Sequence, residues 1–171
     1  MEKLKEIFSD KLIKPKDKTE QVSKLFLDGQ VTPEQMAAFA GAGADTVKAT
    51  CLEAMEYATK IRPEAGDGIV FDFARQSLGE KAPRVKWESA RIIGNIIHQH
   101  PSRIPEVLEG LYANARHSGT VVRWSAAYAI GQVIKVKSRY NNEILREVKE
   151  ILAGEEKNSI RKIYLDAMKK L

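Results

Sequence analysis

The side chains with the types needed for catalysis or metal binding are few and poorly placed for either. The three histidines, His98, His100 and His117, are the candidate bases or metal ligands. His98 and His100 lie two residues apart at the end of an expected helix, so their side chains point in different directions. No cysteine is near them, and the chain has neither paired cysteines nor a His-x-x-Glu-His motif. We therefore expect no metal site.

The single cysteine and the glycines give no catalytic pattern either. Cys51 lies on the apolar side of its expected helix, which favours a packing role over a nucleophilic one. The glycines of Gly41–Gly43 and Gly66–Gly68 do not form a phosphate-binding loop. We predict no catalytic residues, no cofactor, no small-molecule substrate and no enzyme activity.

Two rows of aromatic, basic and amide side chains are more informative. The members of each row are spaced i, i+4, i+8 and i+11, on the side of a helix away from its apolar face. The rows are Trp87, Arg91, Asn95 and His98 and, further along the chain, Trp124, Tyr128, Gln132 and Lys135. Trp, Tyr and Arg dominate binding hot spots, and aromatic and Arg planes also stack on nucleic-acid bases. The rows predict a binding surface, unless Trp87 and Trp124 are wedges between adjacent helices.

A column of basic residues runs beside these rows. Its members are Lys48, Lys86, Arg123 and Arg161. Such side chains either contact a ligand or support neighbouring turns by hydrogen bonds to carbonyl and carboxylate oxygens. We favour structural support, but Lys86 and Arg123 stay among the candidate binding residues.

The rows recur because the chain repeats itself. Residues 85–97 align with residues 122–134 at an offset of 37, with Val, Trp, Ala, Ile and Gly in register. A third copy begins at Val47 and a fourth at Ile160, each 38 residues from its neighbour. Apolar residues in each copy follow the period of a helix. One such position, shared by Met55, Ile93, Ile130 and Met168, is expected to be buried. Gly94 and Gly131 also coincide, which predicts close approach of a neighbouring helix.

Shorter amphipathic runs between the copies complete a helix–turn–helix unit. These runs are Gly68–Leu78, Ile104–Ala115 and Glu143–Leu152. The sequence thus predicts an all-α fold, a right-handed α-α superhelix of stacked helix–turn–helix repeats, in a single domain of residues 1–171. The repeats are expected at approximately residues 31–63, 64–101, 102–139 and 140–171. Residues 1–30 are expected to be a degenerate N-terminal cap, with Lys14–Lys18 as a linker.

The pattern Val-Arg-x-x-Ala-x-x-Ala-Ile-Gly resembles the HEAT-repeat family. Residues 122–131 match it best and residues 85–94 next, and the resemblance covers roughly residues 31–171. The family's turn before the second helix usually carries Asp and Pro, for which only Asp45 and Pro83 are candidates here, so looser turns are expected. In that family the second helices line the concave face of the solenoid. The resemblance implies that the two rows lie there.

A thinner resemblance is to the HEAT-like alkylpurine DNA glycosylases, which carry Trp and basic side chains on the inner face of similar repeats. Those enzymes need a carboxylate beside the lesion. One turn after Trp87 this chain has Arg91, and one turn after Trp124 it has Tyr128. Glu88 is adjacent to Trp87 in sequence and so points about 100° away from it. This resemblance implies nucleic-acid binding without glycosylase activity.

Composition sets wider limits on the function. The chain has 171 residues, of which 43% are hydrophobic and 30% charged, the balance of a soluble globular protein. No apolar run approaches the roughly 20 residues of a transmembrane helix, and the charged N-terminus does not look like a signal peptide. The net charge of +5 permits an acidic protein or a nucleic acid as partner. The lone cysteine favours a cytoplasmic location.

These patterns together predict a non-enzymatic binding or scaffold module. Its concave face is expected to bind a protein partner, such as an acidic or helical segment, and no membrane. The alternative is a nucleic-acid-binding protein, whose affinity would fall steeply with salt. The candidate binding residues are Trp87, Arg91, Trp124, Tyr128, Asn95, Gln132, Lys86 and Arg123.

Overall fold

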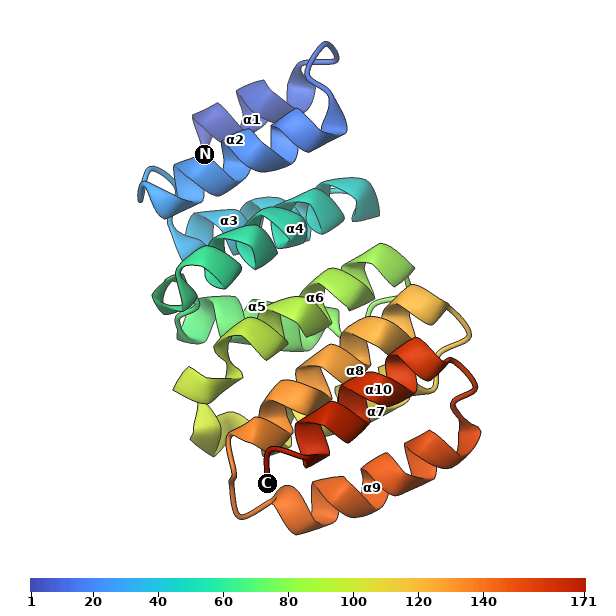
Figure 1. Ribbon diagram of the computed structural model, residues 1–171. Coiled ribbons are helices and arrows are strands. Elements are labelled where there is room, and N and C mark those ends of the chain that lie inside the picture. Colours follow the sequence, from blue (N-terminus) through green and yellow to red (C-terminus); the bar gives the residue numbers. More distant parts are fainter.

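Helices account for all the regular secondary structure of the chain. The computed structural model describes residues 1–171 and contains ten α-helices, three short 3-10 helices and no strand (Figure 1). The α-helices are α1 (Glu2–Ser9), α2 (Pro15–Leu27), α3 (Pro33–Ala42), α4 (Asp45–Ile61), α5 (Gly68–Ser77), α6 (Pro83–Ile96), α7 (Pro105–Ala115), α8 (Thr120–Lys135), α9 (Asn141–Gly154) and α10 (Asn158–Met168). The 3-10 helices are Pro63–Ala65, Ile97–Gln99 and Pro101–Arg103. The predicted all-α fold of helix–turn–helix repeats is confirmed.

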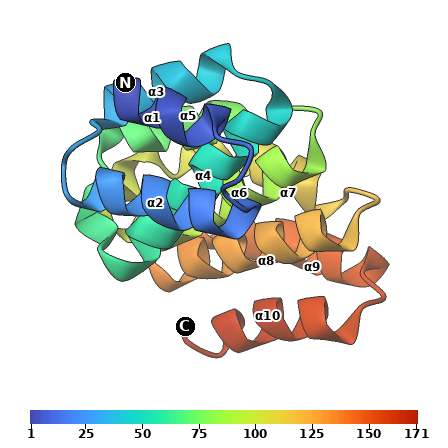
Figure 2. The same ribbon diagram turned by 90° about the horizontal axis from the view of Figure 1, so that it is seen from above.

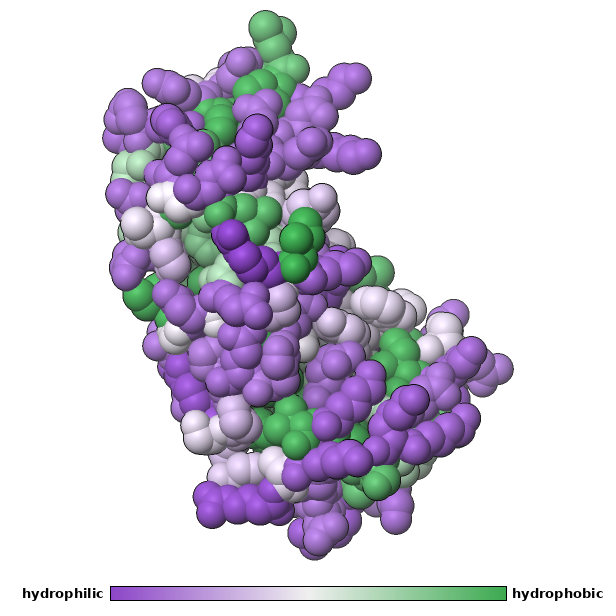
Figure 3. All heavy atoms as spheres, turned by 60° about the vertical axis from the view of Figure 1, so that its left-hand side comes forward, coloured by the Kyte–Doolittle hydropathy of each residue, from purple (hydrophilic) through white to green (hydrophobic).

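Consecutive helices form pairs, and the pairs stack into two layers (Figures 1 and 2). The even-numbered helices, α2 to α10, form one layer, which we call the second-helix layer, and the odd-numbered helices form the other. Neighbours in the second-helix layer pack closely along their lengths, whereas odd-numbered neighbours touch much less. A stack that is tighter on one side curves toward that side. The second-helix layer therefore lines the hollow that is visible in profile in Figure 3.

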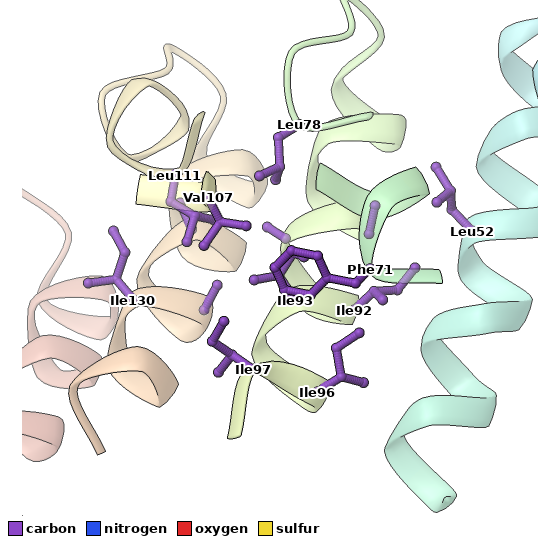
Figure 4. Packing of buried hydrophobic residues seen from close by; sticks show 14 of the residues in the cluster. Leu52, Phe71, Leu78, Ile92, Ile93, Ile96, Ile97, Val107, Leu111 and Ile130 are labelled. Atoms are coloured by element: carbon purple, nitrogen blue, oxygen red, sulfur yellow. The ribbon is translucent and has the colours of Figure 1, made fainter. Parts of the chain in front are cut away.

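One cluster of buried hydrophobic side chains runs the length of the stack, from Leu4 in α1 to Ala167 in α10. Figure 4 shows its centre, where side chains from α4 to α8 converge. Met55, Ile93 and Ile130 are fully buried, as the repeat alignment predicted. Met168 is only partly buried and packs against the edge of this cluster.

The N-terminal residues are more regular than the sequence suggested. Residues 1–30 contain a helical pair, α1 and α2, that continues the two layers. The expected linker at Lys14–Lys18 is instead the first turn of α2, with Pro15 at its first position, where the missing N–H of proline is harmless. Leu4 and Val22 are fully buried. From residue 31 on, each predicted repeat range contains one helical pair. None of the helices combines the length and hydrophobicity needed to cross a membrane.

Candidate functional site

Large hydrophobic side chains are exposed on only one of the two layers. Those within helices are Tyr57 and Ile61 on α4, Val121 and Trp124 on α8, and Leu165 on α10, each at least 40% exposed. The other exposed ones, Met1, Leu12 and Leu171, lie at the chain ends and in the turn between α1 and α2. We call these five residues on α4, α8 and α10 the apolar surface. It follows the second-helix layer and therefore faces the hollow.

Trp124 and Tyr128 form the aromatic centre of this surface. Their rings are stacked, with centroids 6.2 Å apart and planes 8° from parallel. Trp124 is 40% exposed, so it is not a wedge between helices. Tyr128 is half-buried, and its hydroxyl donates a hydrogen bond of 2.7 Å to Asn95 Oδ1. The exposed indole and the anchored phenol make a flat apolar platform on α8.

The two amide side chains of the predicted rows, Asn95 and Gln132, differ in their availability to a ligand. Asn95 is buried, and its Nδ2 donates to Glu56 O and to Thr59 Oγ1, both at 3.1 Å. It therefore joins α6 to α4 and is not available to a ligand. Gln132 is half-buried on α8, where no hydrogen bond within the chain occupies its side-chain amide. Of the two predicted amides, only Gln132 can serve a partner.

Beside the aromatic platform lies a group of three carboxylates, Glu53, Glu56 and Glu88, which we call the acidic cluster. Arg91 Nη2 lies 2.9 Å from Glu56, and Arg91 Nη1 lies 3.8 Å from Glu88. Arg84 pairs with Glu53, which also accepts a 2.8 Å hydrogen bond from Thr19 of α2. Two guanidinium groups therefore face three carboxyl groups between α4 and α6.

Glu88 is the least satisfied member of the acidic cluster. Its side chain is 4% exposed, and its Oε1 accepts a 2.9 Å hydrogen bond from Trp87 Nε1. Its Oε2 is buried and has no hydrogen-bond partner. Burial raises the pKa of this carboxyl to about 7; Trp87 and Arg91 oppose the shift, and Glu53 and Glu56 add to it. Trp87 is half-buried, so its indole covers the carboxyl while keeping part of its own surface exposed.

The side chains of the basic column form hydrogen bonds and ion pairs within the protein. Lys86 Nζ donates to Leu78 O and Asn114 Oδ1, both at 3.1 Å. Arg123 donates to Glu155 at 2.8 Å and to two carbonyls of the turn before α8 at 3.0 Å. Arg161 donates to Leu152 O at the end of α9 and to Glu155 O in the turn before α10, and Lys48 pairs with Glu80. Each member ties its helix to a nearby turn, which favours structural support over ligand contact for Lys86 and Arg123.

Of the candidate catalytic residues, Cys51, His100 and His117 are buried or hydrogen-bonded within the chain, whereas His98 is exposed. Cys51 is fully buried, and burial raises the pKa of its thiol to about 12. His100 Nε2 lies 2.8 Å from Gly66 O, and His117 Nδ1 accepts a hydrogen bond from Gly119 N. No group of three or more His, Cys, Asp or Glu side chains is placed to hold a metal ion.

A pocket of about 370 Å³ lies away from this site, between the turn before α8 and the end of α9. Arg123 and Glu155, already paired with each other, line it together with Arg116, His117 and Glu150. Its charges largely compensate one another, so it offers a ligand no distinct chemistry.

The comparisons with known proteins identify the class to which this fold belongs. No protein-family model and no curated protein matches the sequence. The chain is similar to a designed armadillo repeat protein in complex with the peptide (KR)4, with 19% identity, a TM-score of 0.62 and coverage of 89% of this chain and 68% of that chain. It is also similar to computationally designed armadillo repeat proteins for modular peptide recognition, with 17% identity, a TM-score of 0.69 and coverage of 90% and 69%.

A natural complex shares the same architecture. The chain is similar to the complex of CpcE and CpcF of phycocyanin lyase from Nostoc sp. PCC7120, with 15% identity, a TM-score of 0.65 and coverage of 95% of each chain. These neighbours are armadillo- and HEAT-like repeat proteins. The fold is therefore an armadillo/HEAT-like α-solenoid, as the HEAT resemblance of residues 122–131 implied.

Proposed function

We propose that the protein is a non-enzymatic scaffold that binds a segment of a protein partner on its second-helix layer. The observation that carries this proposal is the apolar surface, because the helices of the opposite layer expose no large hydrophobic side chain. Exposed apolar groups gathered on one hollowed face are typical of an interaction site. Among the predicted residues, Trp87, Trp124, Tyr128, Gln132 and Arg91 remain candidates for contact with the partner.

The solved neighbours support a peptide or protein ligand in general. One of them was solved with a bound peptide, and another was designed for modular peptide recognition. They do not support the nucleic-acid alternative. The basic side chains are also poorly available to nucleic-acid phosphates, because those of the basic column are bonded within the protein and Arg84 and Arg91 face carboxylates. The same pairing removes the basis for an acidic partner, since the column presents no unengaged cation to it.

Two negative expectations belong to this proposal. We propose no catalytic activity and no cofactor, because Cys51 is buried, His100 and His117 are hydrogen-bonded within the chain, and no group of three His, Cys, Asp or Glu side chains surrounds the exposed His98. The single buried cysteine supports a reducing compartment such as the cytoplasm.

A selection experiment tests the proposal, with Trp124→Ala as the decisive variant. A phage-displayed library of random peptides is selected on the wild-type protein, and the affinity of the enriched peptides is measured by calorimetry. We expect Trp124→Ala to lower that affinity about thirtyfold, the effect of a hot-spot loss near 2 kcal/mol. Its free energy of unfolding should change by only about 1 kcal/mol, because the indole is exposed.

Leu12→Ala is the matched control. Leu12 is 92% exposed in the turn between α1 and α2, off the apolar surface. Its truncation should leave peptide affinity unchanged. Failure of any peptide to enrich, or an equal loss of affinity in both variants, would refute binding on this surface.

A further inference from the structure

We propose that the acidic cluster is a subsite for a cationic side chain, the guanidinium or ammonium group of an Arg or Lys in the bound segment. This inference rests on the proposed function, because it assigns chemistry to one part of the same surface. The segment of the partner that binds is accordingly basic, whereas the net charge of this protein led us to expect an acidic segment.

The charge count of the cluster points to a missing cation. Three carboxyl groups face two guanidinium groups, so one negative charge is uncompensated when all are ionised. Glu56 and Glu88 are 5% and 3% exposed and share the single guanidinium of Arg91. Buried carboxylates are stable only when they are paired and hydrogen-bonded. A second cation would complete the pairing that Arg91 leaves unfinished.

The unpartnered oxygen shows where that cation is needed. Glu88 Oε2 has no hydrogen-bond donor within the chain and lies 3.8 Å from Arg91 Nη1, beyond hydrogen-bond distance. Arg91 is 29% exposed, and the proposed subsite requires its side chain to turn toward Glu56 so that a cation can reach Glu88. An arriving guanidinium can then donate to Glu88 while Arg91 keeps Glu56.

The aromatic side chains near the cluster suit the same ligand. Trp87 bonds to Glu88, and its indole is partly exposed next to the carboxyl. Tyr57, on the neighbouring α4, is 51% exposed. Aromatic faces attract Arg and Lys cations, and they also cover the alkyl stems of those side chains. The two arginines of the cluster, Arg84 and Arg91, already face carboxylates.

Defined peptides test the charge preference directly. Three labelled peptides of equal length, one of alternating Lys and Arg, one of alternating Asp and Glu and one of alternating Ser and Gly, are titrated with the protein by fluorescence anisotropy at physiological ionic strength. We expect the Lys-Arg peptide to bind more tightly than both others, although the protein itself is positively charged. Tighter binding of the Asp-Glu peptide, or no binding of the Lys-Arg peptide, would overturn the inference.

Two variants localise the effect. Glu88→Gln should lower the affinity for the Lys-Arg peptide about tenfold or more at pH 8, whereas Glu150→Gln, at an exposed position on α9, should leave it nearly unchanged. Equal losses in both variants would indicate net charge rather than a subsite. Loss of fold cannot mimic the result, because removing an under-paired buried charge is expected to stabilise the free protein.

The pH profile gives an independent check. Cation binding favours the ionised form of Glu88, so wild-type affinity should rise about tenfold between pH 6 and pH 8, a rise that Glu88→Gln abolishes. The charged groups that face Glu88 are Glu53, Glu56 and Arg91. A flat wild-type profile would contradict the assignment. The peptide selection distinguishes failure of the cation subsite from failure of the scaffold proposal. If the enriched peptides bind through Trp124 but contain no Arg or Lys, the scaffold proposal is supported and the cation subsite is refuted.

Discussion

Ionisation of Glu88 lowers the stability of the fold, whereas the proposed cation subsite requires Glu88 to be ionised. Its buried Oε2 has no partner, and its pKa is raised from 4.5 to about 7, chiefly by burial. Between these two values the folded protein holds a proton that the unfolded chain has released. The free energy of unfolding therefore falls as pH rises through this window, and the loss is complete above pH 7. The ionised Glu88 therefore destabilises the fold at neutral pH, and a bound cation would offset this cost.

A substitution at Glu88 should reveal this penalty. We expect Glu88→Gln to raise the free energy of unfolding at pH 8 by on the order of 3 kcal/mol, because the amide carries no charge and still accepts from Trp87. At pH 4 the carboxyl is largely protonated in both states, so the gain should nearly vanish. Urea unfolding at the two pH values measures the difference. Equal stabilities of variant and wild type at pH 8 would show that the carboxylate is adequately paired.

At the scale of helices, the spacing between neighbours depends on small residues at particular positions. A Cβ atom added at Gly94 of α6 would lie 2.5 Å from Tyr128 Cε1 of α8 and 3.3 Å from the Ala129 backbone. A Cβ at Gly131 of α8 would meet its nearest neighbour, Ala167 of α10, at an ordinary 3.5 Å. The close approach of a neighbouring helix that the repeat predicts is therefore present at Gly94, whereas at Gly131 the neighbouring helix leaves room for a methyl group.

The two glycines should consequently respond in opposite ways to the same change. Gly94→Ala is expected to destabilise the protein by about 1–3 kcal/mol, because the methyl group displaces the ring of Tyr128. Gly131→Ala should stabilise it by up to about 1 kcal/mol, since alanine favours a helix interior and the space is available. Thermal unfolding of both variants decides the matter. Destabilisation of similar size at both positions would contradict the difference in packing.

The connection of each second helix to its preceding turn should also be measurable. Arg123→Ala removes the bonds that hold α8 to the preceding turn and to Glu155, so we expect a loss of about 1.5–3 kcal/mol in the free energy of unfolding. Peptide affinity should change little. Arg146→Ala, at an exposed position on α9, is the control and should be nearly neutral. Strongly weakened binding with unchanged stability would return Arg123 to the binding surface.

At the scale of the whole molecule, the stack depends on its first pair. Leu4, Val22 and Phe26 contribute to the continuous core, so deletion of residues 1–30 would expose the apolar side of α3 and α4. We expect the truncated protein to bind a hydrophobic dye and to melt at a lower temperature than the full chain, because an uncapped repeat array exposes its core. Unchanged melting would mean that the first pair is dispensable.

The repeated parts of the fold were predictable, and the parts that depend on packing were not. Apolar periodicity recurs at 37 or 38 residues, so helix type and stacking follow from the sequence alone. Of the predictions for residues 1–30, only the linker at Lys14–Lys18 was wrong: its lysine-rich sequence lacks the repeat pattern, although Pro15 is a common first residue of a helix.

The candidate site was predicted only in part. The spacing of Trp124 and Tyr128 revealed the aromatic platform, because both lie on one helix. Glu56 and Glu88 lie on different helices, and only their packing buries both against one arginine. The sequence gives one hint of this arrangement, the three-residue spacing of Glu88 and Arg91, which places them on the same helix face.

The chain of hydrogen bonds from Tyr128 through Asn95 to Glu56 O has a kinetic consequence. It crosses α8, α6 and α4 and holds neighbouring helices at fixed spacing in the free protein. A partner therefore meets a surface that is already formed, and little conformational entropy of the solenoid is lost on association. Association should accordingly be limited by encounter and orientation rather than by rearrangement, with rates of about 10⁵–10⁷ M⁻¹s⁻¹. Differences among ligands would then appear mainly in how long each one stays bound.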